Sequence, residues 1–478
     1  MKKFLRSAFL ISAGGALPLL SSVVLLYPYT QNLNTGDFGA LAIFISFTIL
    51  VQFLMNYGMD TYLSVHYFDH HNDPAALKVF LSKISGMLLL YGIILIILFA
   101  ACGNLLFRLV FPGGNIAFFP YGLMSVVTAF FNTYFRTYVN LQVFGDKPWK
   151  YFSMGLFNFV VTVTISTVLI YQHPFSLFGP MWGRFLSGVL IFLLSLWFVL
   201  REFGLRIDLS MLPDIRKYTT PLLLFNLLTW VLGYVNNYIL NAYETTADVG
   251  VYDFALKCTL LIEYAGLGVL GTINPRIYKY WRENALTAST QYENRYHHVY
   301  SAFNIVFIAF NILIIPVLVH IFVLNESYYA SLVFVPILCV SFVFRGAHNM
   351  FLNPLYFFKQ TKKLPLVFSI AAVIQVVLGI LFTKYWGIAG AVWSYFAVKV
   401  VQVFLLWIVS RRYFTFRFNI VKMIVLPGIY TLCVIFLFTC KQLQMLEASL
   451  IQIGLALVLV GIVFRREIIT LPGFWKKA

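Results

Sequence analysis

Residues 364–412 read LPLVFSIAAVIQVVLGILFTKYWGIAGAVWSYFAVKVVQVFLLWIVSRR and indicate the type of fold most clearly. It contains two apolar runs, 364–383 and 388–410, each close to the roughly 20 residues that a helix needs to cross the hydrocarbon core of a bilayer. Lys384 separates the runs, and Arg411 and Arg412 follow the second run directly. The stretch therefore predicts two membrane-spanning helices joined by a short outer loop.

Similar apolar runs recur along the whole chain and predict about fourteen spans, which makes the expected fold an all-α polytopic membrane protein. The other twelve runs lie at 7–29, 38–62, 79–101, 117–138, 150–170, 176–200, 215–240, 250–272, 299–323, 329–350, 420–440 and 445–464.

Positive charge is distributed unevenly between the connections. Of the 34 Lys and Arg residues, 27 lie in alternate connections, 3 (Arg108, Lys384 and Lys441) in the connections between them, and 4 inside the spans. Short loops rich in Lys and Arg remain cytoplasmic, so the pattern predicts that both termini are cytoplasmic. The net charge of +17 is then explained by loops that face anionic lipids, and no nucleic acid is expected as a partner.

The composition excludes a soluble domain, since 61% of the residues are hydrophobic and only 11% are charged. No connection between predicted spans exceeds roughly 25 residues, which leaves no room for a globular domain outside the membrane. The five cysteines have neither metal-ligand nor disulfide spacing, so we expect them to be packing residues.

A weak internal repeat divides the chain. The sequence TGDFGA at 35–40 resembles TADVGV at 246–251, and Pro18-Leu19-Leu20 resembles Pro221-Leu222-Leu223. Transporters are often built from such repeats. We therefore predict two pseudo-repeated six-helix lobes, 1–205 and 206–412, followed by two further helices and a cytoplasmic tail at 413–478.

Short motifs accompany this layout. Asp37-Phe38-Gly39 precedes Asn56-Tyr57-Gly58-Met59-Asp60, and the sequence DVGVYDFA at 248–255 leads to Asn274-Pro275. With these motifs the chain resembles the Wzx-type oligosaccharide flippases of the multidrug/oligosaccharidyl-lipid/polysaccharide exporter superfamily.

The resemblance implies a transporter rather than an enzyme. Such a protein moves undecaprenyl-diphosphate-linked oligosaccharide repeat units from the cytoplasmic to the outer face of the bacterial inner membrane by alternating access. These units serve O-antigen, capsule or exopolysaccharide biosynthesis. The resemblance further implies no cofactor, transport coupled to an H⁺ or Na⁺ gradient, and membrane lipids, a polysaccharide polymerase and glycosyltransferases of the same pathway as partners.

Four cations inside the spans point to an anionic substrate independently of the resemblance. Lys399 lies about 16 Å into its span, near the bilayer midplane, and Lys257 and Arg184 lie about 10 and 12 Å deep. Charges at such depths normally face a watery cavity or a partner. Arg345, near the inner end of its span, fits either a cavity or snorkelling to the interface. We expect Arg184, Lys257, Arg345 and Lys399 to bind the diphosphate or an acidic sugar.

Two acids inside the same spans are candidates for ion coupling. Asp253 lies four residues before Lys257 on one helix face, so a local ion pair is the alternative explanation for both. Glu263 lies about 120° around the helix from Lys257. It either couples transport to H⁺ or Na⁺ or contacts a neighbouring span.

Other functions remain open. A lipid II flippase fits the same layout, whereas a multidrug antiporter needs an acidic pocket and the first span, 7–29, has no acid. A polytopic glycosyltransferase or polymerase usually needs a larger outer loop. The cluster DHHND at 69–73 would suit a divalent metal in such an enzyme or form a solvated turn.

Overall fold

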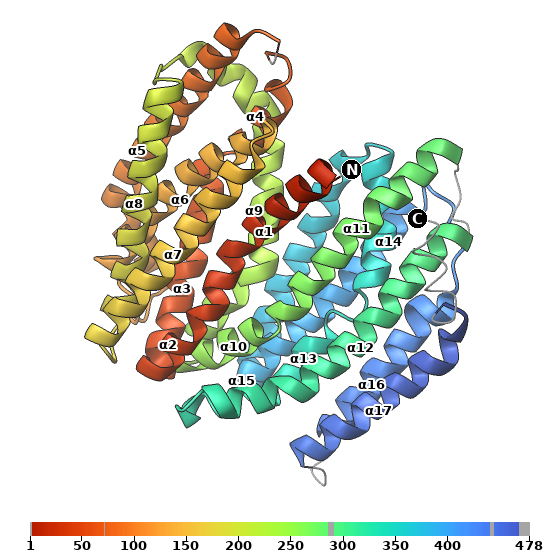
Figure 1. Ribbon diagram of the computed structural model, residues 1–478. Helices are drawn as coiled ribbons and strands as arrows, with labels where there is room; N and C mark the ends of the chain where they lie inside the picture. The colour runs from red at the N-terminus through yellow and green to blue at the C-terminus, as the bar shows by residue number, and fades with distance from the viewer. Residues whose placement is uncertain (1, 71, 285–290, 440–443, 468–478) are drawn as a thin grey trace. The chain divides into compact units, whose positions relative to one another are not determined.

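The computed structural model describes residues 2–70, 72–284, 291–439 and 444–467, and every regular element within these ranges is helical (Figure 1). The all-helical fold that the sequence predicts is thus confirmed. Residues 1, 71, 285–290, 440–443 and 468–478 lie outside the described ranges, together with Cys440, Lys441 and the basic tail.

The chain forms two compact units, Met1–Gly250 and Val251–Ala478. Their boundary falls later than the predicted repeat boundary at 205/206, because helix α9 (Leu212–Tyr243) packs on α3 (Thr35–Asn56) and α4 (Met59–His66) of the first unit. The division into 1–205, 206–412 and 413–478 concerns the internal repeat and stays a prediction.

The first unit contains nine α-helices within the described residues. Besides α3, α4 and α9 they are α1 (Lys2–Val24), α2 (Leu26–Asn32), α5 (Pro74–Val110), α6 (Tyr121–Phe144), α7 (Pro148–Gln172) and α8 (Phe178–Glu202), with a 3₁₀ turn η1 (Leu209–Met211) before α9. Helix α8 packs on α6 and α7, α1 on α7, and α3 on α6.

Small residues let the helices of this unit approach closely, as is usual between membrane helices. An added Cβ at Gly179 would lie 2.7 Å from the Ile170 Cα of α7, so that glycine is needed where α8 crosses α7. Between α3 and α4 the chain turns sharply through Tyr57 (φ 48°) and Gly58 (φ 75°). The predicted span at 38–62 is therefore one full helix followed by a short one.

The two Asp-x-Gly sequences begin helices in the same way. Asn34 accepts a hydrogen bond from the Asp37 backbone N–H (2.7 Å) at the start of α3. Thr245 accepts one from the Asp248 N–H (3.2 Å) and donates its hydroxyl to the Asp248 carboxylate (2.6 Å) at the start of α10 (Thr246–Cys258). Each pair caps otherwise unpaired N–H groups of its helix.

The two glycines of these sequences meet where the starts of α3 and α10 cross. A Cβ added to Gly39 would overlap the carbonyl oxygen of Thr246, and a Cβ added to Gly250 would overlap the carbonyl oxygen of Thr35. All four residues belong to the first unit. The crossing therefore brings backbone against backbone and tolerates only glycine at both positions.

The second unit begins within α10, and ten further helical elements follow in its described residues. They are α11 (Leu260–Asn284), α12 (Gln291–Phe322), the 3₁₀ segment η2 (Glu326–Val333), α13 (Val335–Val340), α14 (Arg345–Phe357), η3 (Thr361–Lys363), α15 (Leu364–Ser410), the π-helical turn η4 (Val421–Val425), α16 (Leu426–Thr439) and α17 (Met445–Val463).

Helix α12 is the centre of this unit and packs on α11, α13, α14 and α17. Buried polar side chains join the helices. Gln452 of α17 donates to the Ala309 carbonyl of α12 (2.8 Å) and accepts from the Tyr430 hydroxyl of α16 (2.7 Å). Because all these groups are paired, the contacts contribute stability where no water is available.

Within the described residues, 11 helical segments, or up to 12 if the bent pair α1 and α2 is one span, are long and apolar enough to cross a membrane. Helix α6 coincides with the predicted span at 117–138 but is not among them. Helix α15 is broken at Gly387 (φ 56°, ψ −132°), which separates the two runs at 364–383 and 388–410. The count of fourteen stays a prediction.

The cysteines vary in burial. Cys339 is buried and Cys258 and Cys433 are partly buried, but Cys102 is exposed on α5, so the prediction that it is a packing residue is wrong. The apolar run around Cys102 forms an exposed surface, with Ile97 and Leu105 more than half exposed, and composition alone does not distinguish such a surface from a core.

Candidate functional site

Two cations and one acid lie together in the second unit. Glu263 belongs to α11, Arg345 begins α14, and Lys399 lies in the second half of α15. The Arg345 Nη1 atom lies 3.6 Å from the Glu263 Oε1 atom. Lys399 interacts electrostatically with both of these residues. The structure thus brings together three of the side chains that the sequence nominates for the site.

Aromatic rings hold the Lys399 ammonium. Its Nζ atom lies 5.0 Å from the ring centroid of Tyr395 and 5.8 Å from that of Phe342. The Arg345 guanidinium lies 5.9 Å from the same Phe342 ring. Cations are attracted to ring faces at such distances. No carboxylate oxygen of the described residues lies within 4.0 Å of the Lys399 ammonium, so its charge is free to attract a bound anion.

A break between α13 and α14 positions these groups. The chain turns at 341–344, and Asn304 of α12 donates to the carbonyls of Phe342 (2.7 Å) and Val343 (3.3 Å). The Phe342 carbonyl also accepts the Arg345 backbone N–H (3.0 Å), so backbone and Asn304 together stabilise this turn. Residues Val335–Phe357 still form one segment long and apolar enough to cross a membrane, so the span predicted at 329–350 is found with later bounds. The turns at 341–344 lie within it, after helix α13, and they contain Phe342 and directly precede Arg345 of the cluster.

The glycine at position 266 makes room for the Tyr300 hydroxyl beside Arg345. A Cβ added to Gly266 of α11 would lie 2.8 Å from the Tyr300 hydroxyl and 3.5 Å from the Arg345 Cδ atom. Within the described residues the buried Tyr300 hydroxyl has no hydrogen-bond partner. The described residues therefore leave one buried hydroxyl beside Arg345 without a hydrogen bond, which is costly unless another group pairs with it.

A chain of amides extends the cluster along α14. Asn349 donates to Asn274 of α11 (2.8 Å), Asn353 donates to the same Asn274 oxygen (3.1 Å), and Tyr278 donates to Asn353 (2.9 Å). Sequence reasoning missed this network. A signal was present, since Arg345, Asn349 and Asn353 recur every four residues and so share one helix face.

Asp253 and Lys257 form the local ion pair that their spacing favours. The Asp253 Oδ2 and Lys257 Nζ atoms lie 2.6 Å apart on α10. The pair neutralises both side chains within one helix face. Their roles in coupling and substrate binding stay predictions.

Arg184 lies in the first unit, half-buried on α8, and interacts electrostatically with the buried Tyr29 hydroxyl of α2. No carboxylate of the described residues lies within 4.0 Å of its guanidinium. Arg184 thus has no ion-pair partner within the described residues, and it is not a member of the Glu263, Arg345 and Lys399 cluster.

A second ionic cluster lies at the end of the second unit that the charge pattern places in the cytoplasm. Glu467 contacts the Lys422 Nζ atom (2.6 Å) and the His298 Nδ1 atom (3.0 Å). Burial raises the pKa of Glu467, but the hydrogen bond and charge of Lys422 outweigh burial and hold this pKa below its ordinary value. These groups fasten the residues after α17 to α12.

Asp73 of the 69–73 cluster has a structural role. Its carboxylate accepts the backbone N–H groups of Ala75 (2.9 Å) and Ala76 (3.1 Å) and caps α5. His71 lies outside the described residues. Elsewhere in the described ranges, no group of three or more His, Cys, Asp and Glu side chains is placed to hold a metal ion.

Comparisons with known proteins agree with the architecture. A family model described as "Polysaccharide biosynthesis protein" matches residues 33–265, slightly under half of the chain. No curated protein matches the chain.

Solved structures of transporters share the fold. The lipid II flippase MurJ in an inward closed conformation has a TM-score of 0.69 at 15% identity, over 94% of this chain and 100% of that one. An inward-facing multidrug resistance MATE family transporter of the MOP superfamily has a TM-score of 0.65 at 14% identity, over 84% of this chain and 97% of that one. An outward-facing structure described as such a transporter has a TM-score of 0.57 at 15% identity, over 86% and 95%. The chain therefore has the fold of these flippases and multidrug transporters.

Proposed function

We propose that this protein flips undecaprenyl-diphosphate-linked oligosaccharide repeat units from the cytoplasmic to the outer face of a bacterial inner membrane, as a Wzx-type exporter with both termini in the cytoplasm. The observation that carries the proposal is the pairing of Arg345 and Lys399 around Phe342 with Glu263 as the acid beside them. The match of the polysaccharide biosynthesis model to residues 33–265 supports the substrate class.

The cluster suits a diphosphate chemically. A guanidinium grips two phosphate oxygens at once, whereas an ammonium meets phosphate as a point charge. Arg345 and Lys399 offer one group of each kind, and the Tyr300 hydroxyl adds a donor. In this proposal the substrate displaces Glu263 from Arg345, and Arg184 and Lys257 contact the diphosphate or an acidic sugar at other stages of alternating access.

Coupling to an H⁺ or Na⁺ gradient remains part of the proposal. Asp253 and Glu263 are the acids that we assign to it, and both contact cations. An ion can bind either carboxylate only when its pair opens. Arrival of an anionic substrate at Arg345 or Lys257 would open the pair and so connect substrate binding to ion binding.

Translocation in proteoliposomes tests the proposal. A labelled undecaprenyl-diphosphate oligosaccharide is incorporated, and its loss of accessibility to an external lectin is followed. We expect wild type to transport and Lys399→Ala to be slower by about tenfold or more, because a charge-assisted contact to phosphate is lost. The matched control is Lys279→Ala, an exposed lysine of α11 paired only with Glu283 among the described residues.

Equal rates for wild type and Lys399→Ala would remove Lys399 from the mechanism. Inactivity of wild type on several glycans would favour a different substrate.

A lipid II flippase is the second candidate, because the structure shares the fold of a lipid II flippase over 94% of the chain. Lipid II presented in the same assay distinguishes the two, since the preferred substrate is the one transported faster at equal density. Export of organic cations is disfavoured because Asp253 and Glu263 already contact cations. Efflux of a fluorescent organic cation by wild type would overturn that assignment.

A further inference from the structure

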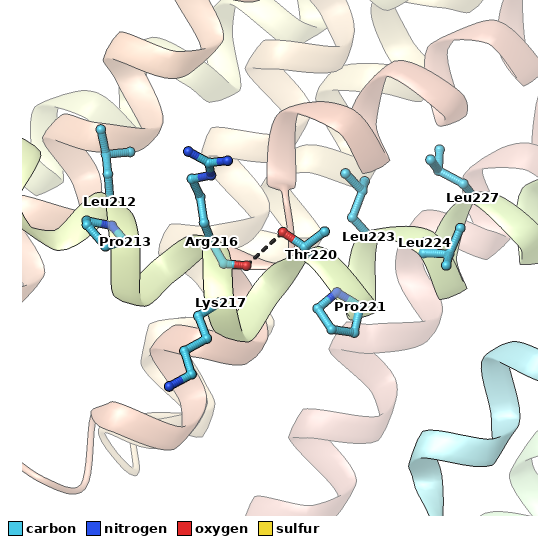
Figure 2. A pocket seen from close by; sticks show the side chains of 9 residues that line it. All are labelled: Leu212, Pro213, Arg216, Lys217, Thr220, Pro221, Leu223, Leu224 and Leu227. Atoms are coloured by element: carbon cyan, nitrogen blue, oxygen red, sulfur yellow. Dashed lines mark hydrogen bonds between the residues drawn. The ribbon is translucent and has the colours of Figure 1, made fainter.

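A groove runs along the first half of α9, outside the cluster described above. Its volume is about 1010 Å³, and its lining comes from a single helix (Figure 2). The lining residues are Leu212, Pro213, Arg216, Lys217, Thr220, Pro221, Leu223, Leu224 and Leu227.

The groove follows one face of α9. Pro213, Lys217, Thr220, Leu224 and Leu227 succeed one another by four and three residues, so they form a line along the helix. The opposite face packs inside the first unit.

Two observations identify that opposite face. Ile215 and Thr219 are buried there, at 1% and 0% exposure. The Tyr218 ring meets the rings of Tyr62 and His66 of α4. Within its own unit, the grooved face of α9 is thus exposed or partly exposed, apart from the contact of Thr220 with the Tyr57 hydroxyl.

The charged residues of the groove lie in its first part. Figure 2 shows Arg216 and Lys217 after Leu212 and Pro213 and before Leu223, Leu224 and Leu227, with the two charged side chains extending to opposite edges of the helix. The distance along the helix from Arg216 to Leu227 is about 16 Å, roughly half of a bilayer's hydrocarbon thickness. The charge pattern places the basic end at the cytoplasmic head groups.

The two cations make no ion pair with the described part of the chain. Both are exposed, and no carboxylate of the described residues lies within 4.0 Å of either. The neighbouring Asp214 interacts with Tyr62 of α4, on the packed side of the helix. The Thr220 hydroxyl already donates to the Arg216 carbonyl (2.7 Å) and contacts the Tyr57 hydroxyl (3.0 Å). Arg216 and Lys217 are thus available to an anion, while Thr220 fixes the helix beside them.

We infer that this groove binds the diphosphate head and the first isoprene units of the polyprenyl carrier. Arg216 and Lys217 meet the diphosphate, and the leucines contact the tail. An anionic head joined to a long apolar chain matches this order of charge and apolar surface along a membrane helix. The inference rests on the proposed function, because it names the place where the carrier part of that substrate is held.

Photolabelling tests the assignment on the full-length protein in nanodiscs of phosphatidylcholine. The probe is a polyprenyl diphosphate without a glycan that carries a diazirine on an early isoprene unit. We expect labelled peptides to contain residues from 212–227. Undecaprenyl diphosphate should compete, whereas inorganic diphosphate, undecaprenol and phosphatidylglycerol should compete at least about tenfold less well, since each offers only part of the match.

Variants supply the controls. Arg216→Gln/Lys217→Gln should reduce labelling about tenfold, and Leu224→Ser, at a half-exposed position, should reduce it while both charges remain. Lys279→Gln/Arg282→Gln removes the same charge from exposed positions of α11 and should label as wild type. Thermal unfolding of each variant separates loss of binding from loss of folding.

Labelling outside 212–227, unchanged labelling of Arg216→Gln/Lys217→Gln, or equal competition by phosphatidylglycerol or inorganic diphosphate would overturn the inference. The proposed function fails separately. If the groove is labelled but wild type translocates no substrate, the proposed function is wrong and the groove assignment stands. If translocation depends on Lys399 but Arg216→Gln/Lys217→Gln labels and transports as wild type, the groove assignment is wrong and the proposed function stands.

Discussion

In the proposed function, Glu263 occupies the place at Arg345 that the substrate phosphate would take. The single contact of 3.6 Å is long for an ion pair, and the Glu263 side chain is 37% exposed, so a bound phosphate can replace it at modest cost. A carboxylate that competes with the substrate lowers the affinity of the site for it. The same carboxylate neutralises part of the charge of the empty site.

Glu263→Gln should therefore tighten binding of undecaprenyl diphosphate roughly fivefold, corresponding to about 1 kcal/mol. The affinity is measured for the purified protein in nanodiscs. Glu283→Gln, an exposed acid of the same helix, is the matched control and should bind as wild type. Weaker binding to Glu263→Gln would show that the carboxylate supports the site instead of competing with the ligand.

Glu467 makes stability depend on pH. Its pKa is lowered in the folded protein, so its contribution is fully present above the unfolded pKa of roughly 4.3 and is lost as pH falls through the lower, folded pKa. Glu467→Gln leaves Lys422 without its carboxylate partner and should cost about 3 kcal/mol at pH 7. Thermal unfolding of wild type and variant should differ most at neutral pH and converge below the folded pKa. A difference that does not change with pH would show that packing of the side chain, and not its charge, fastens the residues after α17.

The two ion pairs among the candidate residues differ in how far the sequence predicts them. Asp253 and Lys257 are four residues apart on one helix, so spacing alone predicts their contact. Glu263 and Arg345 belong to different helices. Spacing predicted only that Glu263 does not pair with Lys257 and must have another partner or bind an ion. That Arg345 is the partner of Glu263 depends on how α14 packs and on the turn before it. Residue spacing along the sequence predicts neither.

At the scale of elements, apolar runs predict where helices lie but not where they break. The run at 329–350 is apolar almost throughout, yet turns interrupt the helix at 341–344, where Asn304 of α12 donates to the carbonyls of Phe342 and Val343. The break at Gly387, by contrast, falls between two runs that Lys384 already separates. A helix interruption that depends on hydrogen bonds from another helix cannot be predicted from the apolar pattern of the sequence.

The crossing of α3 and α10 gives a sharp prediction for an element. Gly250→Ala forces a methyl group onto the Thr35 carbonyl, and we expect a loss of about 1 to 3 kcal/mol in unfolding free energy, or misfolding. Gly454→Ala is the matched control, because nothing lies within 4 Å of an added Cβ there and alanine favours helix. Thermal unfolding in detergent, followed by size-exclusion fluorescence, measures both. Equal stability of the two variants would show that the helices separate readily at this crossing.

At the scale of the whole molecule, charge distribution predicts orientation while the helices themselves do not. Helical packing is satisfied equally well with either end in the cytoplasm. The bias of 27 basic residues against 3 in the intervening connections favours one orientation because loops rich in Lys and Arg are not translocated.

Cysteine labelling tests this orientation in a variant without native cysteines. Lys384→Cys and Lys362→Cys place thiols at exposed positions near opposite ends of the first half of α15. In intact cells a membrane-impermeant maleimide should label Lys384→Cys and should label Lys362→Cys only after permeabilisation. The reverse pattern would invert the topology, and labelling of both in intact cells would contradict a single crossing between them.

The backbone contact between Gly39 and Gly250 has a consequence for genetics. Steric defects between two side chains are commonly relieved by a smaller residue on the facing helix. Here the facing groups are the carbonyls of Thr35 and Thr246, which every amino acid carries. A suppressor screen that starts from a substitution at either glycine should therefore recover reversion or changes elsewhere in the chain, and no compensating substitution at the facing positions.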